Sequence, residues 1–371
     1  MNPGVGSDEP FRDLMAVEGS DLAGTLHDGL RLLARALDQT ALLTPDDPGT
    51  EAYGRVRAVL RGLLDEQTPE QAPAQAAAPV EEEPHQVFDL FERFYADRSV
   101  REHLGETRRH HDPARQWVAF NCALLRLPRK TAETWRAQAA EAVPASHGGP
   151  PATVLPALDT EEDLILPWPD QGIGGVRTAI GAAPHPKVAN ALGHQAVQDP
   201  AGRALAALAS QVLAIAASDP EALYFESLTP QPRPLGETAA LADYTRELLT
   251  RLDAFPPDVS ADPLRALESL VAVDEALCSV AHLPPAADPA SWWNGLAARS
   301  HELVFAQAAG LPGRARVREP ARRFRDVRDL TEDDVPVVSR THPGRVIWCL
   351  RLYAEIDGLP RLGRVVYGVD R

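Results

Sequence analysis

The chain has 371 residues, 44% hydrophobic and 24% charged, with a formal net charge of −16. That length allows two domains, or one large domain with appendages, and a sizeable core. No run of about 18 apolar residues and no basic-then-apolar N-terminal segment occurs, so we expect neither a membrane span nor a secretory signal. The three cysteines, Cys122, Cys278 and Cys349, are widely spaced and form no CxxC motif. We therefore expect a cytoplasmic protein without disulfides.

Arginine dominates the basic residues, since only Lys130 and Lys187 among the 37 are lysines. A coding bias of the genome explains this preference as readily as a need for bidentate recognition of phosphate or carboxylate. The identity of a single arginine is therefore uninformative, and only clusters of arginine point to function.

The N-terminal part predicts helices joined to a linker. Residues 1–20 lack periodicity and are expected to form a flexible tail. Apolar residues then recur every three or four positions, with Thr50 as a cap between two stripes, so residues 21–65 predict a helical hairpin. Residues 66–85 contain four prolines and three consecutive glutamates, which predicts a disordered linker.

Asp-Pro pairs mark predicted helix starts in the rest of the chain. Asp caps exposed backbone N–H groups, and Pro at the first helical position lacks a donor that would have no partner there. The predicted helices begin at Pro113, Pro200, Pro220, Pro263 and Pro289. The glycines Gly172, Gly174 and Gly175 predict a turn that leads into another helix, because no phosphate-loop Lys follows them.

The expected fold is mainly α. Residues 86–143 predict a small basic helical module, residues 144–158 a Pro/Gly-rich spacer, and residues 159–371 a larger helical domain. Only the C-terminus has the pattern of strands, since apolar segments flank the turn residues 357–360 as in a β-hairpin. We therefore expect multi-helical domains with a small C-terminal β-hairpin.

One predicted helix carries candidate catalytic residues. Asp274, Cys278 and His282 follow one another at steps of four residues, which places them on one side of a helix. Cys278 and His282 could bind a metal ion or a haem iron, or form a thiolate–imidazolium pair. In the simpler interpretation, Cys278 is a core residue and His282 stabilises the negative end of the helix dipole.

A candidate helix-turn-helix spans residues 113–136, with a break at Leu127-Pro128. It lies in the first basic segment, residues 101–136, whose net charge is +4. Arg129, Lys130 and Arg136 belong to its second helix, where they could contact phosphates or base edges of DNA. Ordinary helix packing produces the same pattern and is the alternative.

The second basic segment, residues 314–328, holds seven arginines and two acids. Its candidate anion-binding residues are Arg314, Arg316, Arg318, Arg322, Arg323 and Arg325. Their partner is either external, a nucleic acid or an acidic protein segment, or one of the chain's own acidic runs at 331–334 and 81–83.

Three functions remain open from the sequence. The leading hypothesis is a cytoplasmic interaction or regulatory protein that binds an anionic partner, DNA among the candidates, through the two basic segments. The alternative is a metal- or haem-dependent enzyme with its site at Asp274, Cys278 and His282. A third is a scaffold whose partner packs on Trp292 and Trp293. The cofactor, substrate and oligomeric state do not follow from the sequence.

Overall fold

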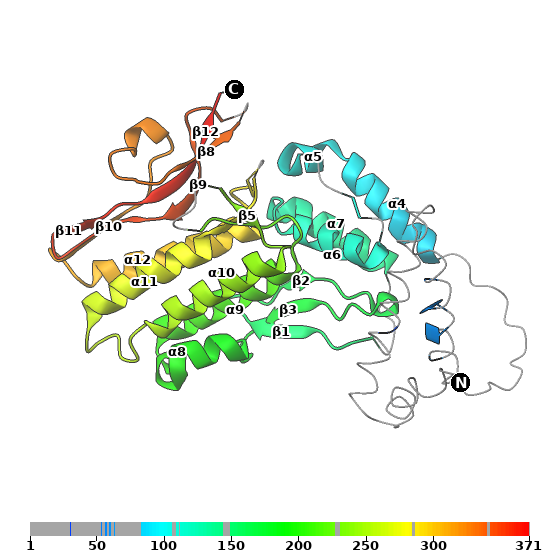
Figure 1. Cartoon of the computed structure of the whole chain (residues 1–371), viewed down its shortest axis with the longest axis horizontal. Coiled ribbons are helices and arrows are strands. Elements are labelled where there is room, and N and C mark those ends of the chain that lie inside the picture. Colours follow the sequence, from blue (N-terminus) through cyan, green and yellow to red (C-terminus); the bar gives the residue numbers. More distant parts are fainter. Residues whose placement is uncertain are drawn as a thin grey trace, which may run out of the picture. The chain divides into compact units, whose positions relative to one another are not determined.

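The computed structural model describes most of the chain from residue 83 onward. The described residues are 83–105, 109–110, 112–143, 149–226, 231–283, 286–339 and 342–370, with isolated positions between 30 and 63. By its contacts the chain divides into two units, Met1–Val80 and Glu81–Arg371, and the labelled helices and strands of Figure 1 all belong to the second. The tail predicted for residues 1–20, most of the predicted hairpin and nearly all of the linker lie outside the described residues.

The described residues form a mixed α/β fold, so the expectation of a mainly α fold is wrong. About 51% of them are helical and 19% are in strands, with nine α-helices and twelve strands arranged in four small sheets. The strands that the sequence does not reveal, β1 to β8, are only two to four residues long, and some contain proline. Such segments are too short for the alternation of apolar and polar residues that identifies a strand.

The first helices of the second unit pack around an aromatic core. They are α4 (Glu83–Ala96), α5 (Arg98–Leu104), α6 (Pro113–Leu124) and α7 (Arg129–Ala142). Phe94 contacts both Phe120 and Trp135 in edge-to-face geometry. The helices α6 and α7 meet at the expected break, which confirms the two-helix organisation of residues 113–136 but does not test contact with DNA.

A three-stranded sheet follows, in the order β1-β3-β2. Its strands are β1 (Thr153–Pro156), β2 (Asp163–Ile165) and β3 (Val176–Ala179). Residues 144–148 of the predicted spacer lie outside the described residues. The glycine turn leads into β3, so the prediction of a helix there is wrong. At Gly175, φ is +77° and a Cβ would lie 2.7 Å from the carbonyl oxygen of Ile165, so glycine lets the chain fold back along β2.

Five helices build the main core. They are α8 (Pro186–Gln198), α9 (Pro200–Ser218), α10 (Thr238–Asp253), α11 (Pro263–Cys278) and α12 (Trp292–Ala309). Among the described helices, only α9 is long and apolar enough to cross a membrane, and 67% of that stretch is buried inside the fold. Such burial is expected of the central helix of a globular core.

The Asp-Pro rule identifies three of the five predicted helix starts. It is confirmed at Pro113, Pro200 and Pro263. The helix α12 begins at Trp292, three residues after Pro289, because Ser291 supplies the N-cap. No helix begins at Pro220. The Asp219 carboxylate accepts a hydrogen bond from the Glu221 N–H and contacts His282, and the chain turns into β4 (Leu223–Tyr224) instead.

The C-terminal β-hairpin is confirmed and is larger than expected. Its strands are β9 (Val346–Arg351), β10 (Tyr353–Ile356), β11 (Leu359–Arg361) and β12 (Arg364–Val369). β9 pairs with β12 and β10 with β11, both antiparallel. Asp357 and Gly358, both at positive φ, form the two-residue turn. Two further strands, β7 (Ala315–Arg318) and β8 (Val335–Val338), extend the two sheets, and β5 (Arg233–Pro234) and β6 (Val280–Ala281) flank β4.

Candidate functional site

The helices α11 and α12 pack side by side (Figure 1). Three reactive side chains converge between them. Asp274 and Cys278 lie one turn apart on α11, and His301 comes from α12. The Cys278 Sγ atom lies 3.5 Å from His301 Nε2 and 3.8 Å from Asp274 Oδ1. His301 Nε2 lies 3.7 Å from the same carboxylate oxygen. We call Asp274, Cys278 and His301 the Asp274 cluster.

His282, the third residue of the predicted catalytic set, has different partners. Its Nε2 lies 2.9 Å from Asp219 Oδ2, and its ring packs against Trp293. The helix α11 ends at Cys278 and the chain continues into β6, so His282 does not keep the helical register that the spacing assumed. The structure therefore brings Asp274 and Cys278 together and places His282 in a separate buried pair.

No local pattern in the sequence points to His301. It lies 23 residues after Cys278, on the next long helix. The pair His301-Glu302 also lacks the second histidine of a HExxH motif. Only the packing of α11 against α12 makes His301 a neighbour of Asp274, and a pattern within one helix cannot reveal such a contact.

Burial dominates the electrostatics of the Asp274 cluster. Asp274 and Cys278 are each only 1% exposed. Burial raises the pKa of Asp274, against the opposing effects of His301 and of a 2.7 Å hydrogen bond from Ser300 Oγ. Burial, reinforced by the Asp274 carboxylate, raises the pKa of the Cys278 thiol well above its ordinary value. Burial therefore disfavours the charged form of both groups.

One oxygen of this buried carboxyl group has no partner. Asp274 Oδ2 is inaccessible to solvent and accepts no hydrogen bond from any described residue. Buried polar atoms in proteins are nearly always paired, so each exception requires a physical explanation. The lone pairs of this oxygen are available to a proton or to a cation held beside the thiol and the imidazole.

A pocket of about 310 Å³ lies beside the cluster, and His301, Trp348 and Cys349 contribute to its lining. Burial raises the pKa of Cys349 well above its ordinary value, and the Asp274 carboxylate adds to this effect. Trp348 Nε1 donates a 2.7 Å hydrogen bond to the carbonyl oxygen of Cys278. This bond holds the end of α11 against β9, so the pocket and the cluster share a wall.

Glu275, the neighbour of Asp274, connects α11 to two other elements. Its carboxylate accepts a 2.9 Å hydrogen bond from Arg251 of α10 and a 3.3 Å hydrogen bond from Arg351 of β9. Both arginine side chains are largely buried. The backbone that carries Asp274 is therefore fixed on the side opposite α12 as well, and fixed ligands are a requirement for a selective site.

This arrangement does not fit a thiol nucleophile. In a Cys–His–Asp catalytic set, the carboxylate orients the imidazole through the nitrogen that faces away from the nucleophile. Here Asp274 and Cys278 both contact Nε2 of His301. The thiol is also buried, and its pKa is raised rather than lowered. The cluster instead resembles three ligand atoms arranged around a common centre.

The first basic segment is partly neutralised within the fold. Arg129 forms an ion pair with Glu162 at 3.1 Å, and Arg126 forms one with Glu221. Lys130 is exposed. Arg136 extends into a pocket that Arg129 also lines, so the three predicted contact residues do not present one common exposed face.

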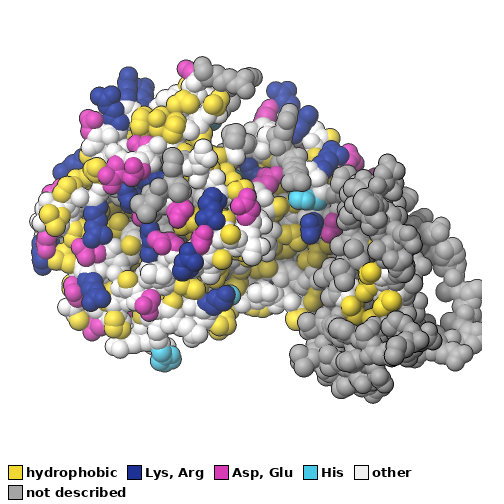
Figure 2. All heavy atoms as spheres, viewed as in Figure 1, with side chains coloured by type: hydrophobic (Ala, Val, Ile, Leu, Met, Phe, Trp, Pro, Cys, Tyr) yellow, Lys and Arg dark blue, Asp and Glu magenta, His cyan; other side chains and the backbone are white. Residues whose placement is uncertain are grey.

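The second basic segment is divided between paired and free arginines. Arg314 binds Asp357 through two hydrogen bonds of 2.7 and 2.9 Å, Arg318 lies over the Tyr353 ring, and Arg316 lies on β7. The remaining candidates, Arg322, Arg323 and Arg325, are exposed. Figure 2 shows basic side chains gathered over the segment between β7 and β8. Arg325 forms an ion pair with Asp326 at 3.5 Å, so Arg316, Arg322 and Arg323 are the candidates of this segment that form no ion pair with a described residue.

Trp292 and Trp293, the expected docking surface of a scaffold, are both buried. They pack edge to face against each other, and Trp293 covers the His282 ring.

Comparisons of the whole chain with protein-family models, with curated proteins and with solved structures find no match.

Proposed function

We propose that the chain binds one divalent transition-metal ion through the Asp274 cluster. Zn²⁺ takes carboxylate oxygen, thiolate sulfur and imidazole nitrogen at about 2.0 to 2.3 Å, and tetrahedral geometry then separates the ligand atoms by about 3.4 to 3.6 Å. The three separations in the cluster are 3.5, 3.7 and 3.8 Å. The side chains would need only small shifts to bind the ion.

The observation that carries this proposal is the convergence of Asp274 Oδ1, Cys278 Sγ and His301 Nε2 within 3.8 Å of one another. The second carboxylate oxygen, Oδ2, is buried without a hydrogen-bond partner among the described residues. A bound cation would offset the cost of burying this carboxylate and would favour the thiolate form of Cys278. Cys278 is the last residue of α11, where the negative end of the helix dipole also favours a positive charge.

The neighbouring pocket supports a catalytic role for the ion. Three protein ligands with space for a water or substrate at the fourth position are typical of catalytic zinc, whereas structural zinc has four protein ligands. His301 belongs to the cluster and also lines the pocket. The reaction class that this supports is hydrolysis by a metal-activated water. The volume of this pocket, about 310 Å³, is at the lower limit of small-molecule sites, which measure about 300 to 1,000 Å³. We therefore do not propose haem as the cofactor.

Metal analysis of the purified protein tests the proposal, followed by Co²⁺ uptake into the metal-free form. We expect one equivalent of metal and an optical band from thiolate–cobalt charge transfer. Cys278→Ser and His301→Gln should abolish the band, while Cys122→Ser and His194→Gln, at a buried cysteine and an exposed histidine elsewhere, should retain it. A folded protein that takes up neither Zn²⁺ nor Co²⁺ would overturn the proposal.

We also propose that a basic–aromatic patch binds an anionic partner, with single-stranded nucleic acid as the class it suits best. The patch consists of Arg322, Arg323, Phe324, Arg325, Arg345 and Tyr367. Phe324 and Tyr367 stack with their centroids 3.7 Å apart and line a hollow of about 520 Å³. Arg322, Arg323 and Arg345 form no ion pair with any described residue. Guanidinium groups beside aromatic rings suit phosphates and bases respectively.

Gel-shift titrations with single-stranded oligonucleotides across salt concentrations test this second proposal. Binding should weaken as salt rises, because it depends on phosphate neutralisation. Arg323→Gln combined with Arg345→Gln should lower the affinity, whereas Arg177→Gln, an exposed arginine on β3, should not. No shift at low salt would refute the nucleic-acid proposal, and an equal loss with Arg177→Gln would show unspecific attraction.

A further inference from the structure

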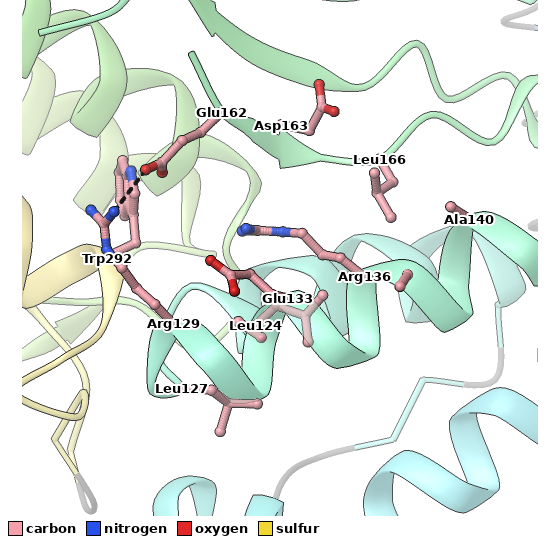
Figure 3. A pocket seen from close by; sticks show the side chains of 12 residues that line it. Leu124, Leu127, Arg129, Glu133, Arg136, Ala140, Glu162, Asp163, Leu166 and Trp292 are labelled. Carbon is pink, nitrogen blue, oxygen red and sulfur yellow. Dashed lines mark ion pairs between the residues drawn. The ribbon is translucent and has the colours of Figure 1, made fainter. Parts of the chain in front are cut away.

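A second pocket lies between α7, β2 and the start of α12, with a volume of about 300 Å³ (Figure 3). One side of it is apolar, formed by Leu124, Leu127, Leu166 and Trp292 together with alanines of α7. The rest is lined by five charged side chains: Arg129, Glu133, Arg136, Glu162 and Asp163. A pocket with an apolar wall and a few converging polar groups is the usual form of a small-molecule site.

One cation in this pocket has no hydrogen-bond or ion-pair partner among the described residues. Arg129 and Glu162 neutralise each other through their ion pair. Arg136 forms neither an ion pair nor a hydrogen bond with any described residue, and its Nε atom is completely buried. Burial lowers the pKa of Arg136, which reflects the loss of hydration around its charge. Figure 3 shows its side chain extending between α7 and β2 toward Glu133 and the Arg129–Glu162 pair.

Two carboxylates in the same pocket are also without an ion-pair partner among the described residues. They are Glu133 of α7 and Asp163 of β2. Both raise the pKa of Arg136 through the electrostatic effect of their charges, although neither forms an ion pair with it. The free groups are therefore one positive and two negative charges, set on two facing elements.

This charge pattern excludes the simplest ligands. The lining has two positive and three negative side chains, so an inorganic anion would meet more repulsion than attraction. A simple cation would meet the unpaired guanidinium of Arg136. The ligand that satisfies both kinds of free group carries a carboxylate and an ammonium group a short distance apart, together with an apolar portion.

We propose that this pocket binds a free α-amino acid with an apolar side chain. The ligand carboxylate accepts hydrogen bonds from the Arg136 guanidinium, the strongest kind of contact that an arginine makes with a carboxylate. The ammonium group donates to Glu133, whose carboxylate lies beside the Arg136 guanidinium in Figure 3. The apolar side chain lies against Leu127 and Trp292. This site shares no residue with the Asp274 cluster or with the basic–aromatic patch, so it stands independently of both proposed functions.

Calorimetric titration of the full chain with L-leucine tests the proposal, beside two analogues that each lack one charge. Leucinamide lacks the carboxylate and 4-methylpentanoate lacks the ammonium group. We expect leucine to bind and each analogue to bind about 10- to 100-fold more weakly, the effect of losing one charge-assisted hydrogen-bonded contact. Inorganic phosphate is not expected to bind. Tighter binding of phosphate or of either analogue than of leucine would overturn the proposal.

Variants of the pocket provide the second arm of the test. Arg136→Gln and Glu133→Gln should each weaken leucine binding about 10- to 100-fold, with folding checked by circular dichroism. Lys130→Gln is the matched control, because Lys130 lies on the same helix but not in the pocket lining, and it should leave the affinity unchanged. Equal affinity in all three variants would overturn the proposal, as would absence of binding to leucine, valine and phenylalanine at millimolar concentrations.

Discussion

His282 Nε2 lies 2.9 Å from Asp219 Oδ2 in a pair that is almost completely buried. Burial lowers the pKa of His282. Burial alone would raise the pKa of Asp219, but its contacts with His282 and with the Glu221 N–H lower this pKa below its ordinary value. The second ring nitrogen, His282 Nδ1, is buried without a hydrogen-bond partner among the described residues. Protonating Nδ1 would leave a buried N–H donor unsatisfied, so the folded state disfavours the charged form of the ring.

We expect this pair to make the fold sensitive to acid. Because the pKa of His282 is lower in the folded chain than the ordinary value of about 6.5, the unfolded chain takes up a proton more readily as pH falls, and unfolding is then favoured. Urea unfolding at pH 7.5 and 5.5 should show a loss of up to about 1.4 kcal/mol per pH unit from this one proton. His282→Gln, which keeps a donor for Asp219, should reduce the slope. An equal reduction in His194→Gln would contradict this assignment.

Metal affinity should increase with pH. The pKa of Cys278 is raised well above its ordinary value, so its thiol holds a proton in the metal-free protein near neutrality and a cation must displace that proton. The raised pKa of Asp274 shifts its carboxyl group in the same direction. Zn²⁺ titrations between pH 6 and 8 should show affinity rising by up to about tenfold per pH unit for each displaced proton. Calorimetry in buffers with different heats of ionisation would count the released protons. A pH-independent affinity would contradict binding at this pair.

Glu275→Gln should destabilise the fold. The change removes the charge that Arg251 and Arg351 share, although each keeps another carboxylate, Glu247 or Glu332. We expect a loss of about 1 to 3 kcal/mol in the free energy of unfolding, measured by chemical denaturation.

The matched control for Glu275→Gln is Glu302→Gln. Glu302 pairs with Arg299 at the surface, where solvent screening limits the loss to about 0.5 kcal/mol. Similar losses for the two variants would show that the buried network contributes no more than a surface pair.

Asn121→Ala should also be costly, because Asn121 joins α6 to the segment after β2. Its amide donates to the Trp117 carbonyl at 2.9 Å and accepts from the Leu166 N–H at 3.0 Å. Removing this fully buried side chain leaves the Leu166 N–H without its acceptor, so we expect a loss of about 1 to 3 kcal/mol in thermal or urea unfolding. Thr134→Ala, at an exposed position of α7, should change stability by less than about 0.5 kcal/mol.

The start of a helix could be predicted from the sequence where the contacts that cap it are made by residues close to it in the sequence. Asp112 caps α6 through its own neighbouring N–H groups, so the Asp-Pro pattern is sufficient there. Asp219 has the same sequence context but binds His282, which lies 63 residues away. The short strands could not be predicted from the sequence for the same reason. The strands β1, β2 and β3 depend on pairing with each other rather than on their own composition.

The candidate site divides in the same way. Asp274 and Cys278 are four residues apart on one helix, and the sequence spacing reveals their proximity. His301 lies beside them only because α12 packs against α11. His282 lies apart from them because the helix ends at Cys278 and β6 follows. The pocket of Arg136 combines residues of α7 with Asp163 of a strand that the sequence does not reveal, so no sequence pattern could have assembled it.

The C-terminal hairpin has a consequence for biosynthesis. Leu352, Ala354 and Ile356 belong to the main hydrophobic core, beside residues of α9 and α11. Trp348 and Val366 contribute to the smaller cluster around Cys278. During translation, the helices therefore leave the ribosome before the strands that cover them. Until the hairpin has been synthesised, apolar surface of α11 stays open to water, and this interval is when the nascent chain most needs protection from aggregation.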